Sequence, residues 1–141
     1  GGIHSSEISR IVCIMRVTSI SYQLSYFGIC SEPTADKSAS SYPGAYIKVQ
    51  NGTATPYCGT TPASGSTTTV TANSWYVWEI VNLGTSWQFR KNGTTFATFT
   101  TALPNAAYPY FIQHGNYFAN TATAGWDYFG VELKAPGQRY T

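Results

Sequence analysis

The sequence predicts an all-β protein, an antiparallel β-sandwich of two sheets, on three observations. Short stretches of alternating apolar and polar residues recur along the chain, and none is convincing as a helix. Charged residues make up only 10% of the 141 residues, whereas aromatic residues reach 16%, and aromatic residues and Thr favour strands. Two Asn-Gly pairs, Asn51-Gly52 and Asn92-Gly93, follow strand-like stretches, and this dipeptide is a strong signal of a hairpin turn.

The first half of the chain reads as long strands separated by one polar loop. Residues Ile8–Thr18 are largely β-branched and apolar, and Ile20–Cys30 alternates in character, so we expect these two strands to be neighbours in one sheet. Ser31–Pro43 is a polar loop with prolines towards both ends. Gly44–Gln50 is the next strand, and residues 54–60 form its short hairpin partner across the Asn51-Gly52 turn.

The second half has the clearest pattern, because short turns join most of its strands. Positive φ at both central positions of a type I′ turn suits Asn92-Gly93, which separates two aromatic strands. Pro109 predicts an edge position, or a strand start, for the strand that contains it. The expected strands are Thr67–Thr71, Ser74–Asn82, Ser86–Asn92, Thr94–Thr100, Tyr108–His114 and Trp126–Lys134.

Alternation along these strands assigns side chains to faces. We expect Trp78, Ile80, Trp87 and Phe89 to point into the core, together with Phe129, Val131 and Leu133 of the last strand, and we assign Trp75 to the core as well. Trp126 and Gly130 then point away. The polar and aromatic side chains expected to share one outer face are Glu79, Gln88, Arg90, Tyr128 and Glu132. A register error of one residue would reverse each assignment.

Length and charge narrow the class of protein. The length fits one domain over residues 1–141, and a chain that starts at Gly1 without a signal-peptide pattern is typical of a piece of a longer protein. A net charge of +2 without a Lys/Arg cluster argues against a nucleic-acid partner. No apolar run in the sequence approaches the roughly 18 residues of a membrane span.

Cysteine and acid spacing offers no metal or catalytic motif. Cys13, Cys30 and Cys58 lie in apolar settings and are expected to be buried thiols, with a Cys30–Cys58 disulfide as the alternative. No Cys/His spacing indicates zinc, and Asp36 and Asp127 are isolated acids. We therefore expect no cofactor and no metal ligands, and leave open a structural calcium ion held by backbone carbonyl groups.

From Trp75 onwards the strands follow in a familiar order. These segments are "SWYVWEIVN", "SWQFRKNG", "TTFATFT", "ALPNAAYPYF" and "WDYFGV". This order, over roughly Trp75 to Leu133, resembles the concanavalin A-like lectin/glucanase jelly roll, including its laminarinase-like and virion-associated branches. The resemblance implies a curved sandwich whose concave face often binds glycans, and motifs built from turns and core aromatics indicate fold more than function.

The hydrolase branch of that family carries a strand with Glu-x-Asp-x-x-Glu, whose carboxylates act as nucleophile and general acid. Here Glu79 has no second acid on its strand, and Asp127 and Glu132 are five residues apart, on opposite faces of a regular strand. We therefore expect no catalytic residues and no enzyme activity.

Three functions remain as hypotheses. The first is a non-catalytic, lectin-like carbohydrate-binding module that holds a glycan on the concave sheet face or its loops. The second is a structural or attachment domain of a virion with homo-oligomer or virion neighbours, and the third is a divergent glycoside hydrolase that uses Glu79 or Glu132. The first two place the protein outside the cell or on a virion surface. The candidate glycan-binding residues are Glu79, Gln88, Arg90, Tyr108, Tyr110, Gln113, His114, Tyr117, Tyr128 and Glu132.

Overall fold

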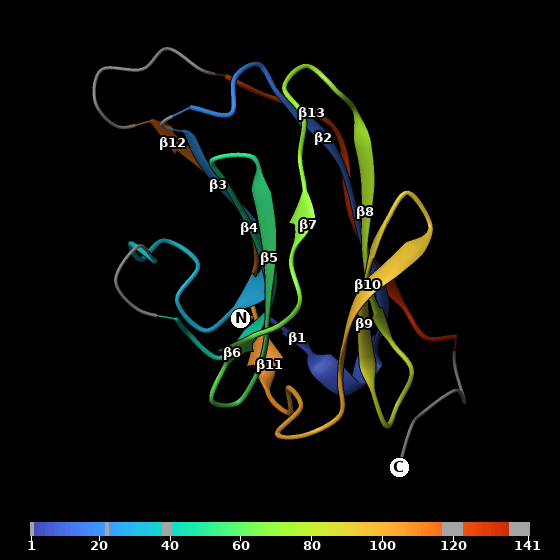
Figure 1. Ribbon diagram of the computed structural model, residues 1–141. Coiled ribbons are helices and arrows are strands. Elements are labelled where there is room, and N and C mark those ends of the chain that lie inside the picture. The colour runs from blue at the N-terminus through green and yellow to red at the C-terminus, as the bar shows by residue number, and fades with distance from the viewer. Residues whose placement is uncertain (1, 22, 38–40, 117–122, 136–141) are drawn as a thin grey trace.

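The computed structural model describes residues 2–21, 23–37, 41–116 and 123–135, and two packed β-sheets dominate it (Figure 1). One sheet, here called the β8 sheet, has the strand order β10-β9-β8-β2-β13. The other, the β4 sheet, has the order β12-β3-β4-β5-β6, with β7 also paired to β5. All pairings within both sheets are antiparallel. The prediction of an all-β, two-sheet antiparallel sandwich is confirmed.

The elements follow one another mostly as the alternation predicts. In the first half they are β1 (Ile3–His4), the 3-10 turn η1 (Ser5–Glu7), β2 (Ile8–Val17), β3 (Gln23–Cys30), β4 (Gly44–Gln50), β5 (Thr53–Gly59), β6 (Ala63–Ser64) and β7 (Thr68–Thr69). In the second half they are β8 (Tyr76–Asn82), β9 (Trp87–Lys91), β10 (Thr94–Phe99), β11 (Ala107–Tyr108), β12 (Tyr110–Asn116) and β13 (Ala124–Leu133).

Both Asn-Gly turns close hairpins. Asn51 and Gly52 have φ values of 50° and 78°, and Asn92 and Gly93 have 49° and 83°, the left-handed backbone that a type I′ turn requires. The first turn joins β4 to β5, and the second joins β9 to β10. The Asn92 side chain also accepts a hydrogen bond from the Val77 amide, which ties this turn to the start of β8.

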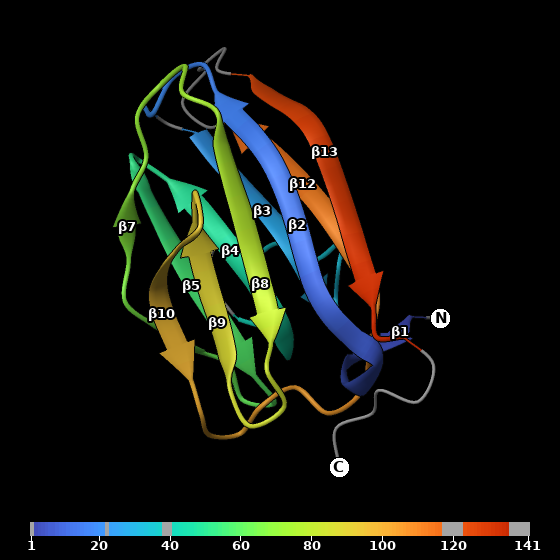
Figure 2. The same ribbon diagram turned by 90° about the vertical axis from the view of Figure 1, so that its right-hand side faces the viewer.

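One topological expectation was wrong. β2 and β3 are consecutive in the chain but lie in different sheets, so they are not neighbours (Figure 2). The chain crosses from one layer to the other between them, and β2 pairs instead with β8 and β13. Alternation within a strand determines which side chains share a face, but it carries no information about the partner of that strand.

The core lies between the two sheets and is built from the predicted inward faces. Trp78, Ile80, Trp87 and Phe89 of the β8 sheet are at most 2% exposed. They meet β-branched and aromatic side chains of the β4 sheet, as in the contact of Phe27 with Trp78 at 6.1 Å between ring centroids. Cys13, Cys30 and Cys58 are free thiols and all three are buried. Burial raises the pKa of each thiol, to about 12 for Cys58.

Irregular pairing between β13 and β2 accompanies two corrections to the expected faces of β13. The pairing with β2 shifts register between Trp126 and Tyr128 and again between Glu132 and Leu133. Trp126 therefore packs inward, with its ring 6.1 Å from that of Phe27, where regular alternation predicted an outward position. Leu133 was expected in the core, but it is 55% exposed. The extra residue at the first shift is Asp127 of β13, and it turns the side chains on one side of it to the opposite face. At the second shift the extra residue is Ser9 of β2, and Leu133 is exposed as the last residue of β13.

Candidate functional site

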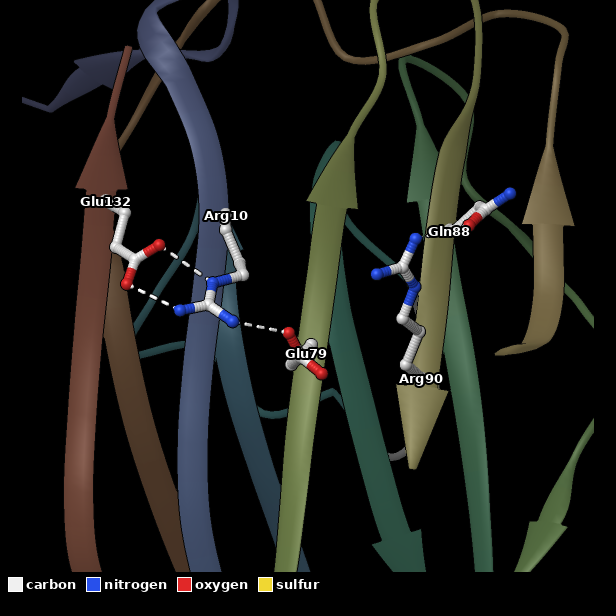
Figure 3. Close-up of polar contacts among 5 residues, drawn as sticks. All are labelled: Arg10, Glu79, Gln88, Arg90 and Glu132. Atoms are coloured by element: carbon white, nitrogen blue, oxygen red, sulfur yellow. Dashed lines mark hydrogen bonds and ion pairs between the residues drawn. The ribbon is translucent and has the colours of Figure 1, made fainter. Parts of the chain in front are cut away.

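The outer face of the β8 sheet carries a line of charged side chains (Figure 3). Arg10 of β2 lies between Glu132 of β13 and Glu79 of β8. Its Nε and Nη2 atoms donate to the two carboxylate oxygens of Glu132, each at 2.7 Å. Its Nη1 atom donates to Glu79 Oε2 at 2.6 Å. Such a bidentate pair holds a guanidinium in one plane, so three neighbouring strands present one connected ionic group, the Arg10 bridge.

The line continues onto β9, where the Arg90 guanidinium donates to Gln88 Oε1 at 2.8 Å. Arg90 and Glu79 are register partners, yet Glu79 forms its ion pair with Arg10. Glu79, Gln88, Arg90 and Glu132 thus share the outer face, as alternation predicted. Sequence reasoning missed Arg10, although its position two residues before Val12 on a regular strand places it on the same face.

Arg10 changes the acid chemistry of this face. Its hydrogen bonds to Glu132 lower the pKa of that carboxyl below its ordinary 4.5. A lowered pKa in the folded protein adds stability above the ordinary pKa, and this contribution disappears as the pH falls below it. Because the side chains of Arg10 and Glu132 are 40% and 44% exposed, the pair contributes about 1 kcal/mol or less.

We expect replacement of Glu132 by glutamine to weaken the acid dependence of stability. The melting temperature of the wild type should fall more than that of Glu132→Gln between about pH 6 and about pH 3, since only the wild type protonates this carboxylate. Calorimetry at both pH values measures the difference. Equal falls for the two proteins would contradict the assignment.

Two aromatic rings lie on the same outer face, against glycines of β13. Trp75, just before β8, has its ring 5.2 Å from the Arg16 guanidinium carbon, and it comes within 3.2 Å of the point where a Cβ at Gly125 would stand. The hydroxyl end of Tyr128 fills the space that a side chain at Gly130 would occupy. Trp75 is 48% exposed and Tyr128 is 49% exposed. We call these two rings the aromatic platform.

The register places the two rings close together. Gly125 pairs with Arg16 and Tyr128 pairs with Ile14, two residues earlier on β2, so their positions are about 7 Å apart along the strand. Val77 pairs with Ile14 from the other side and is 37% exposed. The platform therefore continues as an apolar surface towards β8.

Trp75 was expected in the core, and its exposure corrects that expectation. Alternation from Trp78 and Ile80 places Trp75 outward with Glu79, but the preference of large aromatic side chains for the core was given more weight. Alternation was therefore a signal that could have found it, and Gly125 adds a second one, because glycine inside a strand often marks the close approach of another group.

The remaining predicted residues lie elsewhere. Tyr108 is 3% exposed and packs against the core, because β11 pairs with β1 and turns this side chain inward; its selection as an exposed candidate was wrong. Tyr110 is 63% exposed at the open side of the sandwich, which is the side where β12 and β13 are the end strands of the two sheets. Its ring is 6.1 Å from that of Phe129. Tyr117 lies outside the described residues.

Gln113 and His114 of β12 line a pocket of about 230 Å³ on the outer face of the β4 sheet. Its other walls include Leu24 and Tyr26 of β3 and the loop residues Asp36 and Lys37. The structure thus brings the predicted residues together at two places, on opposite outer faces of the sandwich. Lys37 and Asp36 were not predicted, because alternation says nothing about a loop.

Comparisons with solved structures identify the architecture. Galectin LEC-6 of Caenorhabditis elegans superposes with a TM-score of 0.60 at 13% identity, over 94% of this chain and 88% of that one. A β-glucanase of Bacillus licheniformis gives 0.65 at 14% identity, over 89% and 66%. The carbohydrate-binding module CBM66 of Bacillus subtilis gives 0.54 at 10% identity, over 92% and 76%. The chain has the concanavalin A-like jelly-roll fold.

The resemblance seen in the sequence is thereby confirmed at the level of the jelly roll. No protein-family model and no curated protein matches the sequence. Among the described residues of this jelly roll, no helix has the length and hydropathy needed to cross a membrane. Within the same residues, His, Cys, Asp and Glu side chains form no group of three or more that could hold a metal ion.

Proposed function

We propose that this jelly roll is a non-catalytic, lectin-like carbohydrate-binding module that binds a glycan across the outer face of the β8 sheet. The observation that carries the proposal is the aromatic platform, two half-exposed rings laid against glycines beside a line of charged groups. Half-exposed large aromatic side chains on a sheet face are typical of a binding surface.

The chemistry of a sugar matches both parts of this face. A pyranose ring has an apolar face of C–H groups that stacks on a flat aromatic ring, while its hydroxyls hydrogen-bond to carboxylates, amides and guanidinium groups. From Gly125 to Glu132 the strand extends about 20 Å, which accommodates several sugar residues in a row. Tyr128, Glu132, Gln88 and Arg90 are the proposed contacts, with Trp75 and Arg10 added to them. Glu79 is 9% exposed and supports Arg10 through their ion pair.

The electrostatics favour binding over hydrolysis. A glycosidase needs a general acid whose pKa is raised, whereas Arg10 lowers the pKa of Glu132. Glu79 is bonded to the same guanidinium. A galectin and a carbohydrate-binding module are among the structures with this fold, which agrees with a binding role. This role agrees with the expected location outside the cell.

A glycan array followed by isothermal titration calorimetry tests the proposal. We expect selective signals on the array, and dissociation constants in the micromolar to millimolar range, about −4 to −8 kcal/mol, for the best glycans. No binding at millimolar sugar concentrations would remove the proposal. A release of reducing ends from β-glucans that Glu79→Gln abolishes would replace it with the hydrolase.

A structural or attachment role in a virion is the second candidate, because the open side of the sandwich favours assembly. β12 and β13 are the end strands of their sheets there, and Tyr110, Ile112 and Leu133 are 63%, 42% and 55% exposed. A pocket of about 270 Å³ lined by Tyr110, Phe129 and Val131 lies between these strands. Long edge strands with apolar side chains readily pair with other chains.

For that role we expect a stable oligomer in light scattering coupled to gel filtration at about 100 μM protein, a concentration at which even weak interfaces assemble. Ile112→Lys should shift the mass towards the monomer, because a lysine on an edge strand opposes pairing. Thr95→Lys, on an exposed position of β10, is the matched control and should leave the mass unchanged. A wild type that stays strictly monomeric would count against assembly.

A further inference from the structure

The pocket beside Gln113 lies on the opposite outer face from the aromatic platform. Tyr26, which lines it, belongs to a small cluster with Cys30, Tyr46 and Phe111 that is separate from the main core. In Figure 1 the loop after β3 covers this side of the β4 sheet, away from the β8 sheet. The pocket opens between that loop and the paired strands β3 and β12.

Lys37 fixes the loop wall of this pocket. Its ammonium donates to the carbonyl oxygens of Pro33 and Ala35 at 3.2 and 3.0 Å, and to Gln113 Oε1 at 3.4 Å. It also lies 4.5 Å from the centre of the Phe111 ring. The residue is only 6% exposed, and burial lowers the pKa of its amino group. The neighbouring Asp36 is exposed and also lines the pocket.

Tyr26 supplies a polar group that lacks a partner. It is 3% exposed and lines the pocket, and its hydroxyl has no hydrogen-bond partner among the described residues. A buried hydroxyl without a partner costs free energy, and such groups in folded proteins are rare. A ligand hydroxyl in the pocket could complete this bond, next to the Gln113 amide and the Asp36 carboxylate.

We propose that this pocket is a second binding site, which takes a single neutral sugar ring such as the terminal residue of a glycan. Its volume of about 230 Å³ is below the roughly 300–1,000 Å³ typical of drug-sized ligands, which fits one ring. The Asp36 carboxylate accepts hydrogen bonds and the Gln113 side-chain NH2 donates them, so the site offers acceptors and donors together, and uncharged hydroxyls serve as both. The class of ligand, a sugar, rests on the proposed function, whereas the location of the site does not.

Two-dimensional NMR of the full chain tests the site. The probes are methyl glycosides of glucose, galactose, mannose and N-acetylglucosamine, with glucuronate and glucosamine as charged comparators, each to ~50 mM, which detects millimolar affinity. The side-chain amide of Gln113 reports the pocket, and the indole N–H of Trp75 reports the platform. We expect at least one neutral glycoside to shift the Gln113 signals more strongly than either charged sugar.

Variants assign the binding to the pocket. Asp36→Asn should raise the dissociation constant about tenfold, since a hydrogen bond to a charged group is lost. Tyr26→Phe should raise it severalfold. Trp75→Ala should leave the Gln113 shifts in place. Loss of binding at the platform and loss of binding at the pocket therefore give different results. Three results would overturn the inference. The first is that the Gln113 signals shift with no neutral glycoside in the titration, and the second is that they shift more strongly with glucuronate or glucosamine. The third is a set of Gln113 shifts that stays unchanged in both pocket variants.

Discussion

Replacing Trp75 by alanine is expected to weaken glycan binding by about tenfold or more. Burial of a large apolar side chain under a ligand contributes about 1.5–3 kcal/mol, and about 1.4 kcal/mol corresponds to a tenfold change in affinity. Trp75 is 48% exposed, so much of its ring is available to a sugar. Titration calorimetry with the strongest glycan from the array measures the loss.

The same substitution should leave the fold intact. Trp75 contributes a cation–π contact with Arg16, worth roughly 0.5–1 kcal/mol at an exposed site, so the free energy of unfolding should change by about that amount. Trp75→Phe is the matched control, because it keeps a flat ring and should retain part of the affinity. An affinity for Trp75→Ala within about twofold of the wild type would show that the platform does not bind the glycan.

Replacing Trp78 by alanine is expected to destabilise the protein severely. The two tryptophans are three residues apart, but Trp78 is 1% exposed and its ring contacts those of Phe27, Tyr76 and Phe96 at 5.5–6.1 Å. Truncating a buried aromatic to alanine costs about 3–5 kcal/mol, a large part of the roughly 5–15 kcal/mol that holds a typical domain together.

Urea denaturation followed by circular dichroism measures the loss in the free energy of unfolding. Circular dichroism is the suitable signal, because the fluorescence itself changes when a tryptophan is removed. In a thermal scan followed by the same signal, the melting temperature of Trp78→Ala should fall by on the order of 10 °C. Trp78→Phe, which leaves a smaller cavity, should lose less, and Trp75→Ala serves as the exposed comparison on the same segment. An unchanged urea midpoint for Trp78→Ala would contradict the placement of this side chain between the sheets.

The parts of the fold that depend on local chemistry could be predicted from the sequence. Asn51-Gly52 and Asn92-Gly93 turn the chain because of their own backbone preferences, and alternation on β8 and β9 placed Glu79 and Arg90 outward correctly. The register of β13 could not be predicted, since the bulges at Asp127 of β13 and at Ser9 of β2 depend on how the two strands fit together. The assignment of β2 and β3 to different sheets depends on long-range packing as well.

The candidate site was predictable only where it lies on regular strands. Gln88 and Glu132 follow from alternation, and so does Arg10 once its strand is known. Alternation would have placed Trp75 outward as well, but its size favoured the core. Lys37 lies in a loop, where no period links sequence position to direction. Both acquire their roles from distant neighbours, Gly125 for the one and Phe111 for the other.

The burial of all three cysteines has a practical consequence for studying the two proposed sugar sites separately. Cys13, Cys30 and Cys58 are at most 4% exposed, and a thiol whose pKa is raised reacts slowly with alkylating reagents. A cysteine introduced at an exposed position would therefore be the one readily labelled. The protein could be coupled through it to a chip or bead with either outer face turned towards the solution, while its own sulfur atoms stay untouched.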